Sequence, residues 1–168
     1  MKILFTGAGT GGHIYPLVAI AREIRIIYPK KDLEFYYLGP KDEFTRILLS
    51  QEGFIIRKII SGKIRRYFSL KNIVDILFKL PMGFFQSLFY LLELRPDLVF
   101  SKGGSGSIAV TFAARLLKIP VCIHESDIVP GLSNRKTAKW AKKIFISFPK
   151  TEYFNAGKTV LVGNPVRK

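Results

Sequence analysis

The first 28 residues combine an apolar segment, a glycine-rich loop and an amphipathic segment, and this order constrains the fold more than any other feature. Residues 2–6 are mostly apolar and predict a buried strand, and three glycines at G-x-G-x-x-G spacing (Gly7, Gly9 and Gly12) follow at once. Apolar side chains then recur at helical spacing over residues 13–28. Strand, glycine turn and helix in this order are typical of an α/β fold in which N–H groups at the helix N-terminus contact a phosphate.

The glycine loop alone does not identify a ligand. A dinucleotide enzyme would place an acidic residue at the end of the second strand, but that predicted strand, residues 33–38, ends in Gly-Pro. Asp32 precedes the strand and Glu34 lies within it, so neither is well placed. A tight turn without a ligand is the alternative. His13 favours a functional loop, because a turn does not need an imidazole, and a helix N-terminus favours its neutral form as a base or hydrogen-bond partner.

Length and charge narrow the class of protein. A chain of 168 residues fits one domain, and its formal charge of +15 indicates an anionic partner: phospholipid, nucleic acid or a polyphosphate ligand. The usual nucleic-acid motifs are missing, so we expect no nucleic acid. The single cysteine, Cys122, lies in an apolar run and indicates a reducing, cytosolic setting. Two histidines without a cysteine partner predict no metal site.

The rest of the chain alternates between predicted strands and helices, which indicates a parallel sheet with right-handed crossovers. Further strands are predicted at residues 54–60, 96–100, 121–124, 143–148 and 159–162. Helices are predicted at residues 40–52, after the loop at 101–107, and from Pro130 to Trp140. In the helix at 40–52 we expect Phe44, Ile47 and Leu48 to face inward.

A second glycine loop, residues 101–107, follows the strand at 96–100 and precedes a helix, so the opening pattern occurs twice. Because the carboxyl ends of parallel strands meet at one edge of a sheet, we expect the two loops to line one cleft with backbone donors. Glu125 and Asp127 follow the next strand and are expected to be polar cleft residues that hydrogen-bond a hydroxyl, an amide or a neighbouring loop.

A basic and aromatic segment follows the third predicted strand. Seven basic residues and one acid lie between Arg57 and Lys79, interleaved with aromatic and aliphatic residues. Core-packed helices with solvated lysines are the alternative, but for residues 63–82 we favour contact with an anionic bilayer. The predicted membrane-contact residues are Lys63, Arg65, Arg66, Tyr67, Phe68, Lys71, Ile73 and Leu77. Polar residues and a proline interrupt the apolar stretch 73–94, so we expect a soluble or peripheral protein and no membrane span.

These residues together resemble the N-terminal half of the MurG family of UDP-N-acetylglucosamine transferases, over residues 1–168. The landmarks are Gly9-Thr10-Gly11-Gly12-His13 with Pro16, Gly103-Gly104, His124-Glu125, Gly131-Leu132-Ser133-Asn134 and Gly163-Asn164-Pro165-Val166-Arg167. The resemblance implies an α/β, Rossmann-like, doubly wound parallel sheet that forms the N-terminal half of a GT-B glycosyltransferase. Residues 1–163 would form the acceptor- and membrane-binding domain, residues 164–168 would begin the interdomain linker, and the C-terminal donor domain would be absent from this chain.

The resemblance also implies an activity. The full-length enzyme would transfer GlcNAc from UDP-GlcNAc to lipid I with inversion, making lipid II for peptidoglycan, as a peripheral protein on the cytoplasmic face of the bacterial cell membrane. It implies no cofactor and no tightly bound metal, and we expect residues 1–168 alone to be inactive. Two alternatives are a non-catalytic membrane-recruiting subunit of a two-chain glycosyltransferase and a nicotinamide oxidoreductase, and the second lacks the acidic residue for the ribose.

The family's site residues match positions in this chain. The implied catalytic residues are His13 and Glu125. The residues implied for the donor or its diphosphate are Thr10, Gly11, Gly12, Asp127 and Arg167. The residues implied for the acceptor are Gly103, Gly104, Ser105 and Asn134.

The chain also departs from the family pattern at several site positions. Ala8 replaces a usual glycine, Asp127 replaces a common asparagine and adds a negative charge near a pyrophosphate, and residues 105–108 differ from the usual run. Lys102 is an extra cation, which we expect to bind a phosphate.

Overall fold

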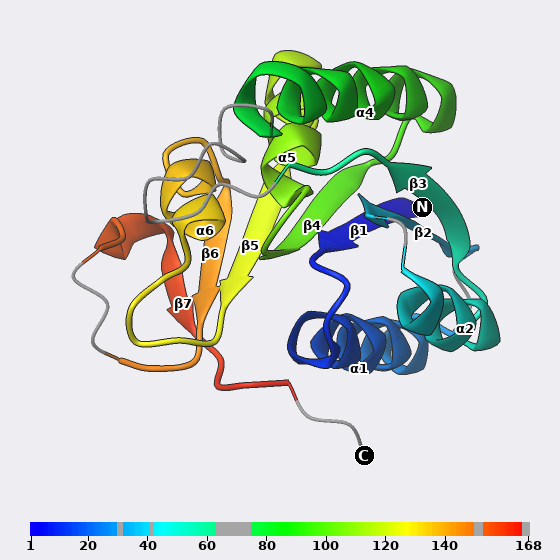
Figure 1. Ribbon diagram of the computed structural model, residues 1–168. Coiled ribbons are helices and arrows are strands. Elements are labelled where there is room, and N and C mark those ends of the chain that lie inside the picture. Colours follow the sequence, from blue (N-terminus) through cyan, green and yellow to red (C-terminus); the bar gives the residue numbers. More distant parts are fainter. Residues whose placement is uncertain (30–31, 41, 63–74, 150–152, 166–168) are drawn as a thin grey trace.

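The computed structural model describes residues 1–29, 32–40, 42–62, 75–149 and 153–165. Within these ranges the chain forms one seven-stranded sheet in the order β3-β2-β1-β4-β5-β6-β7, and all neighbouring strands are parallel (Figure 1). The strands are β1 (Lys2–Gly7), β2 (Glu34–Pro40), β3 (Ile55–Ile59), β4 (Leu98–Gly103), β5 (Val121–Glu125), β6 (Lys143–Ile146) and β7 (Thr159–Leu161). The order reverses between β1 and β4, so the predicted doubly wound, Rossmann-like α/β class is confirmed.

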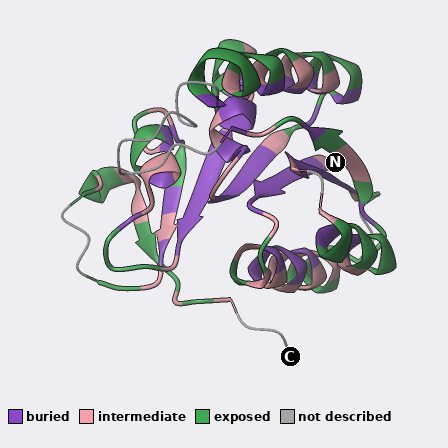
Figure 2. Ribbon diagram, viewed as in Figure 1, coloured by how far each residue is buried: buried purple, intermediate pink, exposed green. Residues whose placement is uncertain are grey.

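Helices cover both faces of the sheet. Helices α1 (Gly11–Ile27) and α2 (Glu43–Gln51) lie on one face, and α4 (Leu80–Leu94), α5 (Ser107–Leu116) and α6 (Leu132–Thr137) lie on the other (Figure 1). Two short elements complete the described chain, the π-helical turn η1 (Asp75–Lys79) and the 3-10 turn η2 (Ala156–Lys158). Alternate residues of β1 enter opposite cores: Phe5 packs in one cluster and Leu4 in the other. The central strands are therefore buried on both faces (Figure 2).

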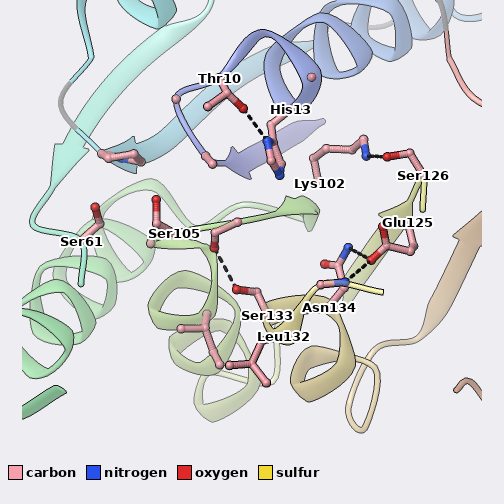
Figure 3. A pocket seen from close by; sticks show the side chains of 18 of the residues that line it. Thr10, His13, Ser61, Lys102, Ser105, Glu125, Ser126, Leu132, Ser133 and Asn134 are labelled. Carbon is pink, nitrogen blue, oxygen red and sulfur yellow. Dashed lines mark hydrogen bonds between the residues drawn. The ribbon is translucent and has the colours of Figure 1, made fainter. Parts of the chain in front are cut away.

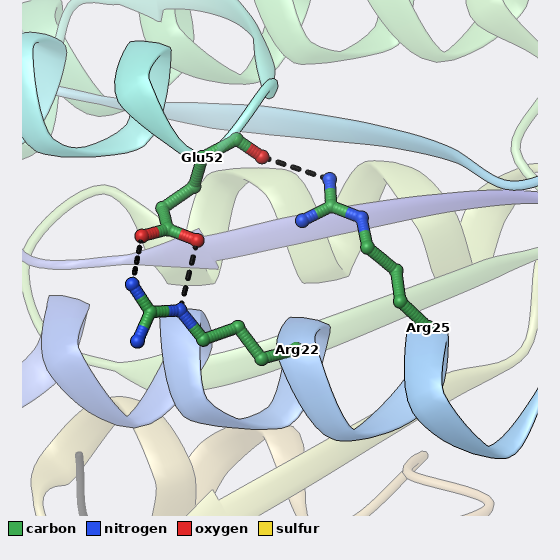
Figure 4. Close-up of polar contacts among 3 residues, drawn as sticks. All are labelled: Arg22, Arg25 and Glu52. Atoms are coloured by element: carbon green, nitrogen blue, oxygen red, sulfur yellow. Dashed lines mark hydrogen bonds and ion pairs between the residues drawn. The ribbon is translucent and has the colours of Figure 1, made fainter. Parts of the chain in front are cut away.

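A polar clamp joins α1 to the C-terminal end of α2. Arg22 Nε on α1 donates to Glu52 Oε2 at 3.0 Å, and Arg25 Nη2 donates to the Glu52 backbone oxygen at 2.8 Å (Figure 4). The Arg25 guanidinium also lies over the Phe35 ring, 4.6 Å from its centroid. Because Glu52 is the C-cap residue of α2, the clamp fixes the end of α2 against α1.

The expected inward face of α2 is wrong for two of its three residues. Phe44 and Ile47 are 43% and 49% exposed, whereas Thr45 and Leu49 are buried. The reason is the helix start: the carboxylate of the N-cap residue Asp42 accepts hydrogen bonds from the Thr45 backbone N–H and hydroxyl, at 2.8 and 2.6 Å. This cap sets the rotation of the helix, so that the row containing Thr45 and Leu49 faces the sheet.

The predicted membrane segment is only partly described. All of its residues except Leu77 (Lys63, Arg65, Arg66, Tyr67, Phe68, Lys71 and Ile73) lie outside the described residues. Leu77 is exposed on η1.

The helical stretch Asp75–Leu94 corrects one expectation. In length and apolar composition it is sufficient to cross a membrane, so its polar residues do not interrupt it as expected. One side of it nevertheless packs on the protein: Ser87 and Leu91 are buried, and a Cβ at Gly83 would lie 2.2 Å from the Ile60 backbone oxygen.

Leu49 and Ile47 give a matched test of this fold. We expect Leu49→Ala to lower the free energy of unfolding by about 3 kcal/mol, because it empties a buried site. Ile47→Ala should lower it by less than about 1 kcal/mol, because the side chain is half exposed. Urea unfolding followed by circular dichroism measures both, and equal losses would contradict the observed rotation of α2.

Candidate functional site

The two glycine loops touch each other at the carboxyl edge of the sheet. Strands β1 and β4 are neighbours, with Gly7 paired to Gly103, and the Ala8 N–H donates to the Gly103 oxygen at 3.0 Å. Gly104 has a φ of +89°, and a Cβ there would lie 2.4 Å from the Ala8 Cβ. Glycine is therefore required at 104 by both conformation and space. The expectation that both loops line one edge is confirmed.

A cavity of about 850 Å³ lies at this edge (Figure 3). Among the residues expected to act, those that line it are Thr10, Gly12, His13, Lys102, Gly104, Ser105, Glu125, Asp127 and Asn134. Gly11 and Gly103 belong to the same two loops but do not line it. Arg167 lies outside the described residues. The fold thus brings side chains from β4, β5, α1 and α6 around one space, which is the usual form of a small-molecule site.

His13 is held at the junction of the two loops. The Thr10 hydroxyl, at the N-terminus of α1, lies 2.7 Å from His13 Nδ1. Nε2 reaches the second loop, 3.1 Å from where a Cβ of Gly104 would stand. Burial lowers the pKa of His13, the nearby Lys102 ammonium lowers it further, and Asp127 opposes this. The imidazole is therefore neutral at neutral pH, and Nε2 accepts a proton when Nδ1–H donates to Thr10.

Lys102 is a buried cation in the wall of the cavity. The residue is 3% exposed, and its ammonium donates to the Ser126 hydroxyl at 2.8 Å (Figure 3). Burial lowers the pKa of Lys102, while the carboxylates of Glu125 and Asp127 raise it. A lysine ammonium has three donors, so this arrangement leaves capacity for an anionic ligand.

Glu125 organises the loop that follows β5. Its Oε1 accepts from the Asp127 N–H at 3.1 Å, and its Oε2 accepts from the Gly131 N–H at 3.0 Å and from Asn134 Nδ2 at 3.1 Å. Asn134 Nδ2 also donates to the His124 backbone oxygen at 3.1 Å. The expected hydrogen bond of Glu125 to an amide is confirmed, and its carboxylate also binds backbone N–H groups of the loop that directly follows β5.

His124 ties β5 to the last described residues. The side chain is buried, and its Nε2 donates to the Gly163 backbone oxygen at 3.1 Å, which also accepts from the Ser147 hydroxyl at 3.1 Å. Burial lowers the pKa of His124 to about 4, despite its bond to Gly163. His124 therefore stays neutral and holds residue 163 beside the strands.

Sequence reasoning missed four polar residues of the cavity wall: Asp42, Ser61, Ser126 and Ser133. Asp42 could have been predicted as a helix N-cap, because it directly precedes α2 and its carboxylate accepts from the Thr45 N–H. Ser61 follows the end of β3, and its position could be inferred from the shared edge of the parallel strands. Ser133 donates to the Gly104 oxygen at 2.9 Å across 29 residues, and no local pattern predicts that contact.

Comparison with known proteins gives a consistent picture. Residues 3–146 match the family described as the glycosyltransferase family 28 N-terminal domain. The chain is 40% identical over 168 residues to the UDP-N-acetylglucosamine–N-acetylmuramyl-(pentapeptide) pyrophosphoryl-undecaprenol N-acetylglucosamine transferase of Clostridium botulinum, and 39% identical over 169 residues to that of Borrelia turicatae. Each match covers 99% of this chain and 46% of the relative, so the chain spans about half the length of the curated relatives it matches.

Solved structures agree on the fold. The crystal structure of Acinetobacter baumannii MurG matches with a TM-score of 0.79 and 29% identity, covering 99% of this chain and 46% of that one. UDP-GlcNAc 2-epimerase from Neisseria meningitidis, bound to UDP-GlcNAc, matches with a TM-score of 0.70 and 16% identity, covering 98% and 47%. The second likeness concerns the fold alone.

The buried His124 predicts a pH dependence of stability. Its folded-state pKa of about 4 lies below the ordinary 6.5, so between these values the unfolded chain binds a proton that the folded chain does not. Stability should therefore fall as the pH drops from 6.5 toward 4, by roughly 3 kcal/mol from this group. His124→Gln should reduce that loss in urea titrations at several pH values.

Ser147→Ala is the matched control, because it removes the other hydrogen bond to Gly163 without removing a titrating group. It should lower stability by a similar amount at every pH. A pH dependence left unchanged by His124→Gln would contradict the assignment.

Proposed function

Because the chain belongs to the glycosyltransferase family 28 N-terminal domain family, we propose that it is the acceptor- and membrane-binding domain of an enzyme that transfers GlcNAc from UDP-GlcNAc to lipid I. The product would be lipid II for peptidoglycan. The observation that carries the proposal is the cavity where two glycine loops meet, with a neutral imidazole and a buried ammonium in its wall. The names of the curated relatives support the substrate pair.

The proposed reaction is an inverting displacement. His13 Nε2 takes the proton of the acceptor hydroxyl, whose oxygen bonds to the anomeric carbon of GlcNAc as the bond from that carbon to the UDP oxygen breaks. The hydrogen bond between Thr10 and Nδ1 fits this role in the tautomer whose Nδ1–H donates to the Thr10 hydroxyl, because Nε2 then has the free lone pair. The N-terminus of α1 and Lys102 supply positive potential for diphosphate charge. Arg167 would add to it at the start of the linker.

We assign Glu125 a positioning role instead of the alternative role of base. Its two oxygens already accept three hydrogen bonds from the loop that contains Asp127 and Gly131 and from Asn134. These bonds use three of the about four lone-pair positions of the carboxylate, whereas no described hydrogen bond uses Nε2 of His13. Asn134 would support the acceptor site indirectly, since it packs against Gly103 in the second glycine loop.

The exposed face of α4 is the proposed membrane contact. Apolar side chains at helical spacing, each more than half exposed, form one stripe that begins on η1 and continues along α4: Phe78, Met82, Phe85, Phe89 and Leu92. Phe112 and Leu116 of the neighbouring α5 extend it, at 48% and 61% exposure. Since the opposite side of α4 packs on the protein, the helix would lie in the interface of an anionic bilayer instead of crossing it. The enzyme would then be peripheral, on the cytoplasmic face of the cell membrane, where lipid I is its acceptor.

The donor half of the reaction belongs to a second domain in this proposal. The relatives are about twice the length of this chain, and a GT-B cleft is built from two domains. UDP-GlcNAc would bind mainly to the C-terminal domain and meet the acceptor above the glycine loops. The proposed chemistry requires no metal, because helix N-termini and cationic side chains stabilise the departing diphosphate.

A chimera tests the reaction. Residues 1–168 joined to the C-terminal part of the Clostridium botulinum relative should transfer radiolabelled GlcNAc to a lipid I analogue, whereas residues 1–168 alone should not. His13→Gln should lower kcat of the chimera by roughly a hundredfold, the loss expected for removal of a general base. Glu23→Gln, an exposed change on the same helix, is the control and should leave kcat unchanged. Transfer by residues 1–168 alone, or full activity of His13→Gln, would refute the proposal.

Vesicle binding tests the membrane face. The double variant Phe85→Ser, Phe89→Ser should bind phosphatidylglycerol vesicles at least roughly tenfold more weakly, because it removes two exposed aromatic rings from the stripe. The matched control is Ile26→Ser, Ile27→Ser, which changes two equally exposed apolar residues on α1, across the sheet. Flotation of the protein with vesicles measures both. Equal loss in the two variants would contradict a specific face on α4.

A further inference from the structure

Lys102 and His13 enter the cavity side by side from different elements. They flank Gly7: a Cβ at that position would lie 3.5 Å from the His13 Cβ and 3.6 Å from the Lys102 Cβ. His13 belongs to the first turn of α1, and Lys102 belongs to β4 (Figure 3). The pairing of β1 with β4 thus holds the Cβ atoms of both residues near Gly7, and both residues line one cavity, with the Lys102 ammonium turned toward Ser126.

The charged groups around His13 are few. Among the described residues that line the cavity, Lys102 is the only lysine or arginine, and the acids are Asp42, Glu125 and Asp127. The carboxylate of Asp42 caps α2, and that of Glu125 holds its own loop. Asp127 is exposed in the loop after β5, and its charge opposes the effect of Lys102 on His13. Lys102 is buried, so water screens its charge less than it screens that of the exposed Asp127.

We propose that Lys102 is a positioning residue that couples the binding of a diphosphate to the proton affinity of His13. This inference rests on the proposed function and adds that the bound diphosphate regulates the base. In the empty cavity the ammonium opposes a second positive charge on His13, so the imidazole stays unprotonated and available. When a diphosphate lies against the ammonium, its negative charges cancel and then exceed that positive charge. The imidazole then attracts a proton more strongly.

As a consequence, the proton affinity of His13 rises only when a diphosphate is bound. The proton that leaves the acceptor hydroxyl moves to Nε2 while the new C–O bond forms and the bond to the UDP oxygen breaks, so proton and charge balance within the complex. Without a diphosphate, His13 would be a weaker proton acceptor.

Two diphosphates could act on Lys102: that of the nucleotide donor and that of the lipid-linked acceptor. They share the charged group and differ in what is attached to it. UDP and geranyl diphosphate therefore serve as separate probes. If both raise the proton affinity of His13 equally, the shared group is sufficient; if only one does, that source is the ligand beside Lys102. Either result supports the coupling.

Histidine NMR on residues 1–168 tests the coupling, because the sequence has only two histidines. His124 titrates near pH 4 and is assigned through His124→Gln, so the remaining signal reports His13. We expect His13 to titrate at higher pH in Lys102→Met than in the wild type. A saturating diphosphate should shift the wild-type titration upward and shift that of Lys102→Met less. Lys102→Arg should restore the wild-type response, and Lys139→Met, an exposed change, is the matched control.

Different outcomes would contradict the coupling and the proposed function. If a diphosphate moves the backbone signals of Gly104 and Ser105 but shifts His13 equally in the wild type and Lys102→Met, the coupling is wrong and the diphosphate site stands. If neither probe moves any signal and the chimera transfers no GlcNAc, the proposed function and the coupling both fail. In the active chimera, Lys102→Met should also move the acidic limb of the kcat profile with pH, and an unmoved limb would overturn the coupling.

Discussion

The contact between the two glycine loops is the constraint on which the site depends. The Ala8 N–H bonds to the Gly103 oxygen, and Gly104 approaches Ala8 too closely for any side chain to fit between them. This contact follows from the pairing of β1 and β4 at the centre of the sheet, where the strand order reverses. It places the N-terminus of α1 and the start of α5 on either side of one cavity. The rest of the wall is then built around a fixed junction of backbone.

Burial and charge act together on the groups at this junction. His13 is kept neutral by burial and by Lys102, and Lys102 itself is held by Ser126 under the influence of two carboxylates. The carboxylate of Glu125 accepts three hydrogen bonds, two from the loop after β5 and one from Asn134, and so holds that loop with Ser126 and Asp127 in a defined arrangement. The His13 imidazole and the Lys102 ammonium keep hydrogen-bonding capacity for a ligand. The other polar groups hold these two side chains in place.

Helix α4 has one side that packs on the protein and one side that is exposed. Helix α4 commits one side to the protein, where Gly83 allows a close approach to the chain after β3, and leaves an aromatic stripe uncovered. A contiguous exposed apolar patch of this kind marks a contact surface for a protein or a membrane. The stripe and the cavity both belong to elements that lie around β4. An acceptor bound in the cavity would therefore lie in the same domain as the surface proposed to contact the membrane.

The sequence by itself determined the class of fold, the two glycine loops and their common edge, because short-range periodicity and glycine spacing encode strands, turns and their order. It also singled out His13 and Lys102 by type. Only the tertiary structure decided that Phe44 and Ile47 face solvent, since the Asp42 cap sets the rotation of α2, and that Asp75–Leu94 forms one continuous helical stretch. Only it decided that Glu125 accepts hydrogen bonds from Gly131 and Asn134 and that Lys102 and His13 lie on either side of Gly7. Hydrogen bonds and charge pairs between residues far apart in the chain depend on distances that no local pattern contains.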